Sequence, residues 1–195
     1  PYVARKKYWG LYEDCEHLEP VVGSIPYEEQ DKHSKRIFDA NDWRNFDITT
    51  KHIRDSRRAY FANISYIDDK IGEIFTALEA TGQAEDTIVL FLSDHGDMLG
   101  ERGLWFKMTF FEGSARVPLM IAAPKMKPGL VTTPVSTMDV TPTLADLAGI
   151  DLSAVAPWTD GETLVPLASG GERRLPVRIE YAAEGSNAPL VSIRE

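Results

Sequence analysis

The sequence predicts an α/β protein with a mixed, mostly parallel sheet flanked by helices. Thr87 to Leu92 is a short apolar run rich in β-branched and aromatic residues, which is typical of a central parallel strand buried on both faces. Ile53 to Ala80 repeats apolar residues at steps of three and four, which is the pattern of an amphipathic helix. Two further apolar runs, Val117 to Ala123 and Leu175 to Tyr181, add two expected strands.

The first fifty residues are predicted to be mostly irregular. One short amphipathic helix is expected before Leu18, because side chains there share helical spacing: Tyr8, Leu11, Tyr12 and Cys15. Residues 19–50 contain prolines and a glycine, many charges and no steady period, so a long ordered loop is expected. His33 and His52 lie among charged residues, and we expect both at the surface.

Two helices are predicted with their ends. The helix from Ile53 to Ala80 is expected to stop at Gly82, and its apolar face comprises Tyr60, Ile64, Ile67, Ile71, Ile74, Phe75 and Leu78. Three arginines near its start are expected to be solvated on the outer face: Arg54, Arg57 and Arg58. A shorter helix is expected through Ala148, with Thr141 as N-cap, Pro142 at the first helical position and Gly149 after its end.

Composition and charge bound the classes of partner. A chain of 195 residues, 43% hydrophobic and 26% charged, is expected to form one domain over residues 1–195. The net charge of −9 makes nucleic acid and anionic membrane surfaces poor partners, and no apolar run reaches membrane-spanning length. The single cysteine, Cys15, permits no internal disulfide, which favours a reducing, cytoplasmic compartment.

The residues after Thr87–Leu92 carry the candidate chemistry. Asp94 and His95 follow the predicted strand at its carboxyl end, where open α/β sheets bind ligands. Carboxylate oxygen favours hard cations and imidazole nitrogen also accepts transition metals, so the pair suits a divalent cation. Lys107, at the far end of a glycine-containing loop, would bring positive charge to an anionic substrate. Each residue alone is commoner as a turn former or a solvated side chain, and only their combination indicates a site.

The same residues carry a resemblance to a known family. The pattern S-D-H-G-D-x-x-G-E-x-G-L-W-x-K, residues 93–107, resembles the second metal-binding segment of sulfatases in the alkaline phosphatase superfamily. The longer stretch SDHGDMLGERGLWFKMTFFEGSARVPLMIAAP is similar to the choline-sulfatase branch. Other segments fit the same picture in order: YEDCEHL, SRRAYFANISYIDDKIGE, DVTPTLADLAGI, PWTDG and IEYAAEGSNAPLVSIRE. Arg102 departs from the wider pattern, where many members carry histidine, and we interpret it as a feature of the branch.

The resemblance implies a function and roles for particular residues. It implies hydrolysis of a sulfate ester, with choline sulfate as the expected small-molecule substrate. Asp94 and His95 would bind one divalent metal ion, calcium first and magnesium or manganese as alternatives. Lys107 would contact the sulfate and the leaving-group oxygen, and Glu184 would face the choline ammonium. The full-length enzyme is expected to be a homo-oligomer.

The sequence lacks the segment that supplies the nucleophile in this family. Sulfatases convert a cysteine or serine in a C-x-P-x-R or S-x-P-x-R motif to formylglycine, and Cys15 has neither the proline nor the arginine. Cys15 is therefore expected to be a partly buried, non-catalytic side chain. We expect the formylglycine upstream of Pro1, and we expect the isolated chain to be inactive. Two alternatives stay open: a phosphonate or phosphate ester hydrolase of the same superfamily, and a non-catalytic α/β binding module.

Overall fold

The computed structural model describes residues 2–15, 18–183 and 186–194, and the chain divides into two compact units. The first unit comprises Pro1–Ala84, His95–Val117 and Ala183–Asn187. The second unit comprises Glu85–Asp94, Pro118–Ala182 and Ala188–Glu195. Within the described residues, no helix has the length and apolar character needed to cross a membrane.

The first unit is built around one long helix. Its helical elements are α1 (Lys6–Gly10), η2 (Tyr27–Glu29), α2 (Lys32–Ala40), η3 (Trp43–Asn45), α3 (Thr50–Ala80), η5 (Glu101–Gly103) and α4 (Glu112–Ala115). α3 confirms the predicted long helix and begins three residues earlier than expected. Thr49 and His52 cap its start reciprocally, since each side chain accepts a hydrogen bond from the other residue's amide at 3.3 Å. Gly82, with φ of +69°, follows its end as predicted.

The packing of α3 differs from the face predicted for it. Its fully buried side chains are Ala59 and Ala62. Part of the predicted apolar face is exposed by 43% to 59%, at Ile64, Ile67, Ile74 and Phe75. α1 packs against α3, where the Tyr8 hydroxyl donates to the Asp69 carboxylate at 2.6 Å. The apolar period therefore identified the helix, but it did not identify the side that its neighbours cover.

Residues 19–50 are more regular than the predicted loop. α2 forms within them because the Asp31 carboxylate accepts hydrogen bonds from the amides of His33 and Ser34, at 2.9 and 3.0 Å. Ile37 on this helix is completely buried. The Phe38 ring meets the Trp43 ring edge-on, with centroids 5.5 Å apart. The expectation of an irregular loop was wrong here because a nine-residue helix with two large apolar residues shows little periodicity.

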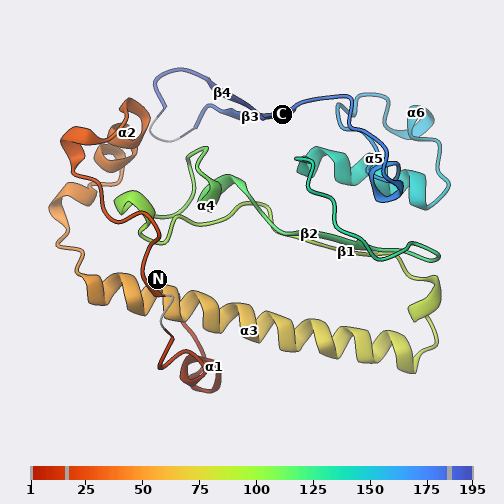
Figure 1. Cartoon of the computed structure of the whole chain (residues 1–195), viewed down its shortest axis with the longest axis horizontal. Helices are drawn as coiled ribbons and strands as arrows, with labels where there is room; N and C mark the ends of the chain where they lie inside the picture. Colours follow the sequence, from red (N-terminus) through yellow and green to blue (C-terminus); the bar gives the residue numbers. More distant parts are fainter. Residues whose placement is uncertain (1, 16–17, 184–185, 195) are drawn as a thin grey trace. The chain divides into compact units, whose positions relative to one another are not determined.

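The second unit contains the three predicted strands and a fourth that was not predicted, and these form two antiparallel pairs. β1 (Val89–Leu92) pairs with β2 (Leu119–Ala122), and β3 (Val177–Tyr181) pairs with β4 (Leu190–Arg194) (Figure 1). All four β1 residues are half-buried. A parallel strand buried on both faces was expected, whereas β1 has an antiparallel neighbour among the described residues. A two-stranded ribbon leaves part of each strand accessible, which explains the intermediate burial.

The remaining helices of the second unit are short. They are η6 (Thr137–Asp139), α5 (Val140–Leu147), α6 (Leu152–Val155) and η7 (Leu167–Ser169), while η4 (Ala84–Asp86) spans the sequence boundary between the units. The predicted cap of α5 at Thr141 was wrong. The N-cap residue of α5 is Asp139, which makes no side-chain cap hydrogen bond to this helix. The capping box belongs to the preceding η6, where the Asp139 carboxylate accepts from the Ser136 amide at 2.7 Å. Gly149, with φ of +69°, follows the helix as predicted.

Candidate functional site

The predicted metal ligands Asp94 and His95 come shortly after the end of β1 at Leu92. Both side chains are exposed. The Nδ1 atom of His95 lies 2.8 Å from the Gly96 carbonyl oxygen. Because a carbonyl oxygen only accepts, Nδ1 is the donor in this contact. A carboxylate and an imidazole are each ligand types that divalent cations accept.

Two such ligands do not make a complete metal site. Across residues 2–15, 18–183 and 186–194, no group of three or more histidine, cysteine, aspartate or glutamate side chains is arranged to hold a metal ion. Calcium takes six to eight oxygen ligands, and magnesium takes an octahedral set that includes water. Asp94 and His95 alone therefore do not complete such a ligand set.

Gly96 fixes the main chain immediately after His95. Its amide donates to the Ser114 carbonyl oxygen at 2.8 Å. A Cβ atom at this position would lie 2.1 Å from the Gly113 carbonyl oxygen, so only glycine fits. This contact joins the segment after His95 to α4, and the apolar pattern of the sequence gave no sign of it.

Asp97, two residues after His95, is held by two donors. The Tyr2 hydroxyl donates to one carboxylate oxygen and the Leu99 amide donates to the other at 2.9 Å. The edge of the Tyr2 ring meets the Tyr60 ring, with centroids 5.2 Å apart. Burial and the hydrogen bond to Asp97 raise the pKa of Tyr2 well above its usual value, and burial and the nearby Asp97 charge raise the pKa of Tyr60. Asp97 thus links the segment after His95 to Tyr2, whose ring in turn contacts Tyr60 on α3.

The loop from Leu99 to Met108, here called the Lys107 loop, has an unusual backbone. Four of its residues other than glycine have positive φ values: Leu99 (47°), Arg102 (59°), Phe106 (63°) and Met108 (76°). Lys107 is exposed and lies between the last two. The left-handed conformation costs about 1–2 kcal/mol for a residue with a side chain. Such a backbone persists only where surrounding contacts determine it.

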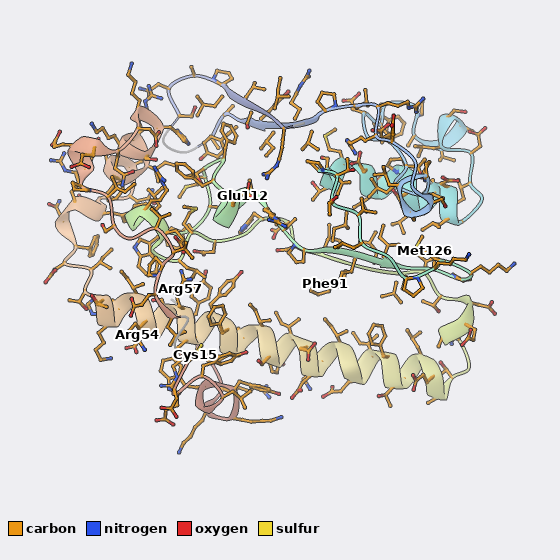
Figure 2. The ribbon with its side chains drawn as sticks, viewed as in Figure 1. Cys15, Arg54, Arg57, Phe91, Glu112 and Met126 are labelled. Atoms are coloured by element: carbon orange, nitrogen blue, oxygen red, sulfur yellow. The ribbon has the colours of Figure 1, made fainter. Side chains whose placement is uncertain are left out.

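The first set of such contacts involves Glu101. Its carboxylate accepts hydrogen bonds from the amides of Val21 and Val22, at 2.9 and 2.8 Å. Arg57, labelled on α3 in Figure 2, donates to the Leu99 carbonyl oxygen at 3.2 Å and lies 3.4 Å from a Glu101 carboxylate oxygen. The Arg57 side chain is only 11% exposed. The expectation that Arg57 is solvated was wrong, because its guanidinium donates to the Leu99 carbonyl oxygen of the loop.

Arg102, the departure from the wider sulfatase pattern, also has a structural role. Its carbonyl oxygen accepts a hydrogen bond from Gln30 Nε2 at 2.7 Å, and Gln30 is buried. Its guanidinium lies over the Phe111 ring, 4.4 Å from the centroid. These contacts hold the loop against the segment before α2 and against the residue that precedes α4.

His33 makes a contact with the loop that the sequence did not reveal. It was expected at the surface, yet it is half-buried, and its Nε2 atom lies 2.7 Å from the Met108 carbonyl oxygen. The expectation was wrong because the partner is a main-chain atom 75 residues away, which no local pattern reports. His52 is exposed, as expected. Cys15, labelled in Figure 2, is a half-buried free thiol, as expected, and Glu184 lies outside the described residues.

Comparison with known proteins assigns the chain to a family. The model of the sulfatase family matches residues 20–150. Choline-sulfatase of Rhizobium meliloti (strain 1021) is 67% identical over 195 residues, which is all of this chain and 38% of that protein. Arylsulfatase of Clostridium perfringens is 36% identical over 152 residues, covering 75% of this chain and 31% of that protein. The chain thus spans well under half the length of these relatives.

The fold comparison agrees. The solved structure of phosphonate monoester hydrolase SpPMH from Silicibacter pomeroyi superposes with a TM-score of 0.75 and 28% identity, covering 92% of this chain and 38% of that one. The sulfatase-like α/β fold class predicted from the sequence is therefore confirmed. Since the family model covers most of the residues and the choline-sulfatase identity extends over the whole chain, this chain belongs to the sulfatase family.

Proposed function

We propose that the full-length protein hydrolyses a sulfate ester and that its substrate is choline sulfate. The observation that carries this proposal is the 67% identity to a choline-sulfatase over every residue of the chain. The exposed carboxylate and imidazole after β1 and the exposed lysine of the Lys107 loop supply matching chemistry. The substrate is anionic at sulfur and cationic at nitrogen, so both signs of charge are needed for its recognition.

Asp94 and His95 are proposed to hold one divalent cation together with donors from the rest of the protein. Calcium fits the carboxylate, and magnesium or manganese are the alternatives. The bound cation supplies positive charge that stabilises the sulfate oxygens. His95 contributes through Nε2, because its Nδ1 proton is committed to the Gly96 carbonyl oxygen.

Lys107 is proposed to contact the sulfate and the leaving-group oxygen. Its ammonium group stabilises negative charge that develops on the leaving oxygen as the sulfur–oxygen bond breaks. The nucleophile is expected to be a formylglycine in a part of the protein outside residues 1–195. Cytoplasmic location and homo-oligomerisation stay predictions.

Glu184 is proposed to face the quaternary ammonium of choline. That group has no proton to donate, so it is recognised by carboxylate charge and by aromatic faces. A carboxylate there lowers the free energy of bound choline sulfate but does little for a neutral aryl sulfate.

A phosphonate or phosphate ester hydrolase is the second candidate function. It is favoured by the superposition with SpPMH at a TM-score of 0.75. Phosphonate and sulfate esters both present anionic oxygens on a tetrahedral centre, so Asp94, His95 and Lys107 would serve either reaction. The leaving group and the charge of the substrate must distinguish the two.

The test compares three substrates with the full-length protein: choline sulfate, an aryl sulfate and an aryl phosphonate monoester. We expect the highest kcat/KM for choline sulfate. Lys107→Ala is expected to lower kcat/KM for choline sulfate by roughly two to three orders of magnitude, as loss of one electrostatic stabiliser commonly does. Glu184→Gln is expected to raise KM for choline sulfate about tenfold, or about 1.4 kcal/mol, and to change aryl sulfate hydrolysis little.

Each arm has an outcome that contradicts it. A higher kcat/KM for the phosphonate than for choline sulfate would move the protein to the second candidate function. Wild-type turnover by the Lys107→Ala variant would make Lys107 an ordinary loop lysine. Equal losses on choline and aryl sulfates in the Glu184→Gln variant would assign Glu184 to the scaffold.

A further inference from the structure

We propose that His33 is a positioning residue for Lys107, acting through the Met108 carbonyl group. This inference rests on the proposed role of Lys107 in the sulfatase reaction. Both residues belong to the first unit, and they come from segments that lie 74 positions apart in the sequence. The contact at issue is the hydrogen bond between His33 Nε2 and the Met108 carbonyl oxygen, at 2.7 Å.

The direction of this hydrogen bond is determined by its chemistry. A carbonyl oxygen can only accept, so His33 Nε2 carries the proton and donates it. Met108 is 8% exposed and His33 is half-buried, so the bond is partly shielded from water. Loss of the donor would leave a carbonyl oxygen without this partner in a buried place, which is unfavourable.

The position of this bond matters because of the backbone around Lys107. Phe106 and Met108 both have positive φ, and they flank Lys107. The Phe106 carbonyl oxygen accepts from the Met98 amide at 2.6 Å, and the Met108 carbonyl oxygen accepts from His33. The peptide group that precedes Lys107 and the peptide group that follows Met108 are therefore anchored, the first by Met98 just before the loop and the second by His33 on α2.

The two hydrogen bonds that hold the backbone around Lys107 depend on different parts of the chain. Met98 and Phe106 lie in one continuous segment, so their bond forms with the loop. His33 comes from α2, which is fixed independently by the Asp31 cap and by the buried Ile37. A second contact from the same region supports the loop, since the Trp43 and Phe106 rings lie with their centroids 6.1 Å apart. α2 and η3 thus hold the left-handed residues that orient Lys107.

Removal of the His33 donor has a defined consequence. Left-handed residues with side chains relax toward extended or right-handed conformations unless contacts hold them. Met108 would be released first, because its carbonyl is the bonded group. The Lys107 side chain would then sample orientations in which its ammonium group no longer reaches the sulfate, and small displacements of a catalytic group lower the rate.

The test is a double-mutant cycle in the full-length protein, with kcat/KM on choline sulfate as the readout. The four proteins are wild type, His33→Ala, Lys107→Ala and the double variant. We expect His33→Ala alone to lower kcat/KM about tenfold, equivalent to about 1.4 kcal/mol. In the Lys107→Ala background, the same change is expected to lower kcat/KM less than about twofold, because its effect passes through Lys107.

Two further variants keep the test decisive if His33→Ala folds poorly. Glutamine places an amide donor at a reach similar to that of Nε2, whereas asparagine places its amide nearer the position of Nδ1. His33→Gln is expected to retain most of the activity, and His33→Asn to lose it. His52→Ala is the matched control, because His52 is exposed and caps α3 without bonding to the Lys107 loop; it is expected to leave kcat/KM within about twofold.

The outcomes separate this inference from the proposed function. If Lys107→Ala retains wild-type turnover, the role of Lys107 is wrong and the positioning role fails with it. If Lys107→Ala loses activity but His33→Ala does not, only the positioning role is overturned. Equal losses from His33→Ala in both backgrounds, or equal activities of the Gln and Asn variants, would show that His33 acts on the fold in general.

Discussion

The two units use their buried polar side chains in different ways. In the second unit, Asp139 is completely buried, and the Arg173 and Glu162 side chains are 8% and 10% exposed. Asp139 accepts hydrogen bonds from Arg173, from the Ser136 amide and from the Glu162 amide. Arg173 also lies 3.5 Å from the Glu162 carboxylate. One buried guanidinium thus lies between two carboxylates inside the unit.

In the first unit, the corresponding groups bind the main chain of a loop. Gln30, Arg57 and His33 donate to carbonyl groups of the Lys107 loop. Glu101, a side chain of the loop itself, accepts from the amides of Val21 and Val22. The lysine at the end of this loop remains exposed. We infer from this comparison that the buried ion pairs of Arg173 stabilise the second unit. In the first unit, the side chains that bind the left-handed backbone of the Lys107 loop fix the position of the exposed Lys107.

The largest expected effect comes from Arg173→Ala in the second unit. This change leaves the Asp139 carboxylate buried without its counter-charge, and breaking one partner of a buried pair lowers the free energy of unfolding by about 3–5 kcal/mol. Urea denaturation of the full-length protein measures the loss. Arg178→Ala is the control, because Arg178 is 66% exposed and lies 3.8 Å from Glu180; a change below about 0.5 kcal/mol is expected.

Similar losses from the two arginine variants would contradict the stabilising role of the buried cluster. Loss of kcat/KM in the fully folded Arg173→Ala protein would also break the comparison, because this cluster would then serve the reaction as well as the fold.

A second test concerns Gly96, where the first unit depends on a close main-chain approach. Gly96→Ala would place a Cβ atom 2.1 Å from the Gly113 carbonyl oxygen, and the backbone must shift to relieve it. Overpacking of this kind costs about 1–3 kcal/mol. Gly72→Ala on α3 is the matched control, since no atom lies within 4 Å of a Cβ there. That change is expected to stabilise the helix by up to about 1 kcal/mol.

Thermal unfolding of the two glycine variants gives the sign of each effect. We expect a lower midpoint for Gly96→Ala and an unchanged or higher midpoint for Gly72→Ala. A midpoint for Gly96→Ala at or above that of the wild type would show that the approach to α4 is not tight in solution.

The sequence predicted the parts of this structure that depend on local pattern. α3, the strands β1, β2 and β3, and the glycine at the end of each main helix follow from apolar spacing and from glycine's access to positive φ. The antiparallel pairing of β1 and the exposed face of α3 were not predicted, because both depend on neighbours distant in sequence. For the same reason, the pattern placed Asp94, His95 and Lys107 in one segment but did not identify His33 or Arg57.

The smallest expected effect comes from Asp31, and it distinguishes the two units. Asp31 caps α2, the helix that carries His33, and accepts from the amides of His33 and Ser34. Asp151 caps α6 in the second unit and accepts from the amide two residues on at 3.0 Å. Asp31→Ala is expected to lower the free energy of unfolding by about 1 kcal/mol. Asp31→Ala is also expected to lower kcat/KM about twofold to threefold, because α2 holds the Met108 carbonyl group, whereas Asp151→Ala is expected to leave kcat/KM unchanged.

The pH dependence of the Asp31 effect has a definite sign. Burial raises the pKa of Asp31, but the hydrogen bonds from the Ser34 hydroxyl and from the amides of Ser34 and His33 outweigh it, so the pKa lies below its usual value. A carboxyl whose folded-state pKa is lowered contributes stability above its unfolded value, about 3.9, and loses it as the pH falls through the folded value. The difference in unfolding free energy between wild type and Asp31→Ala should therefore be constant near neutral pH and shrink below about pH 4. If that difference persists unchanged at lower pH, the cap does not depend on the charge of Asp31.

The kinetic comparison of the two cap variants has its own contrary outcome. If Asp31→Ala and Asp151→Ala lower kcat/KM equally, then α2 does not position the Lys107 loop more than α6 does. The proposed difference between the two units would then have no bearing on catalysis.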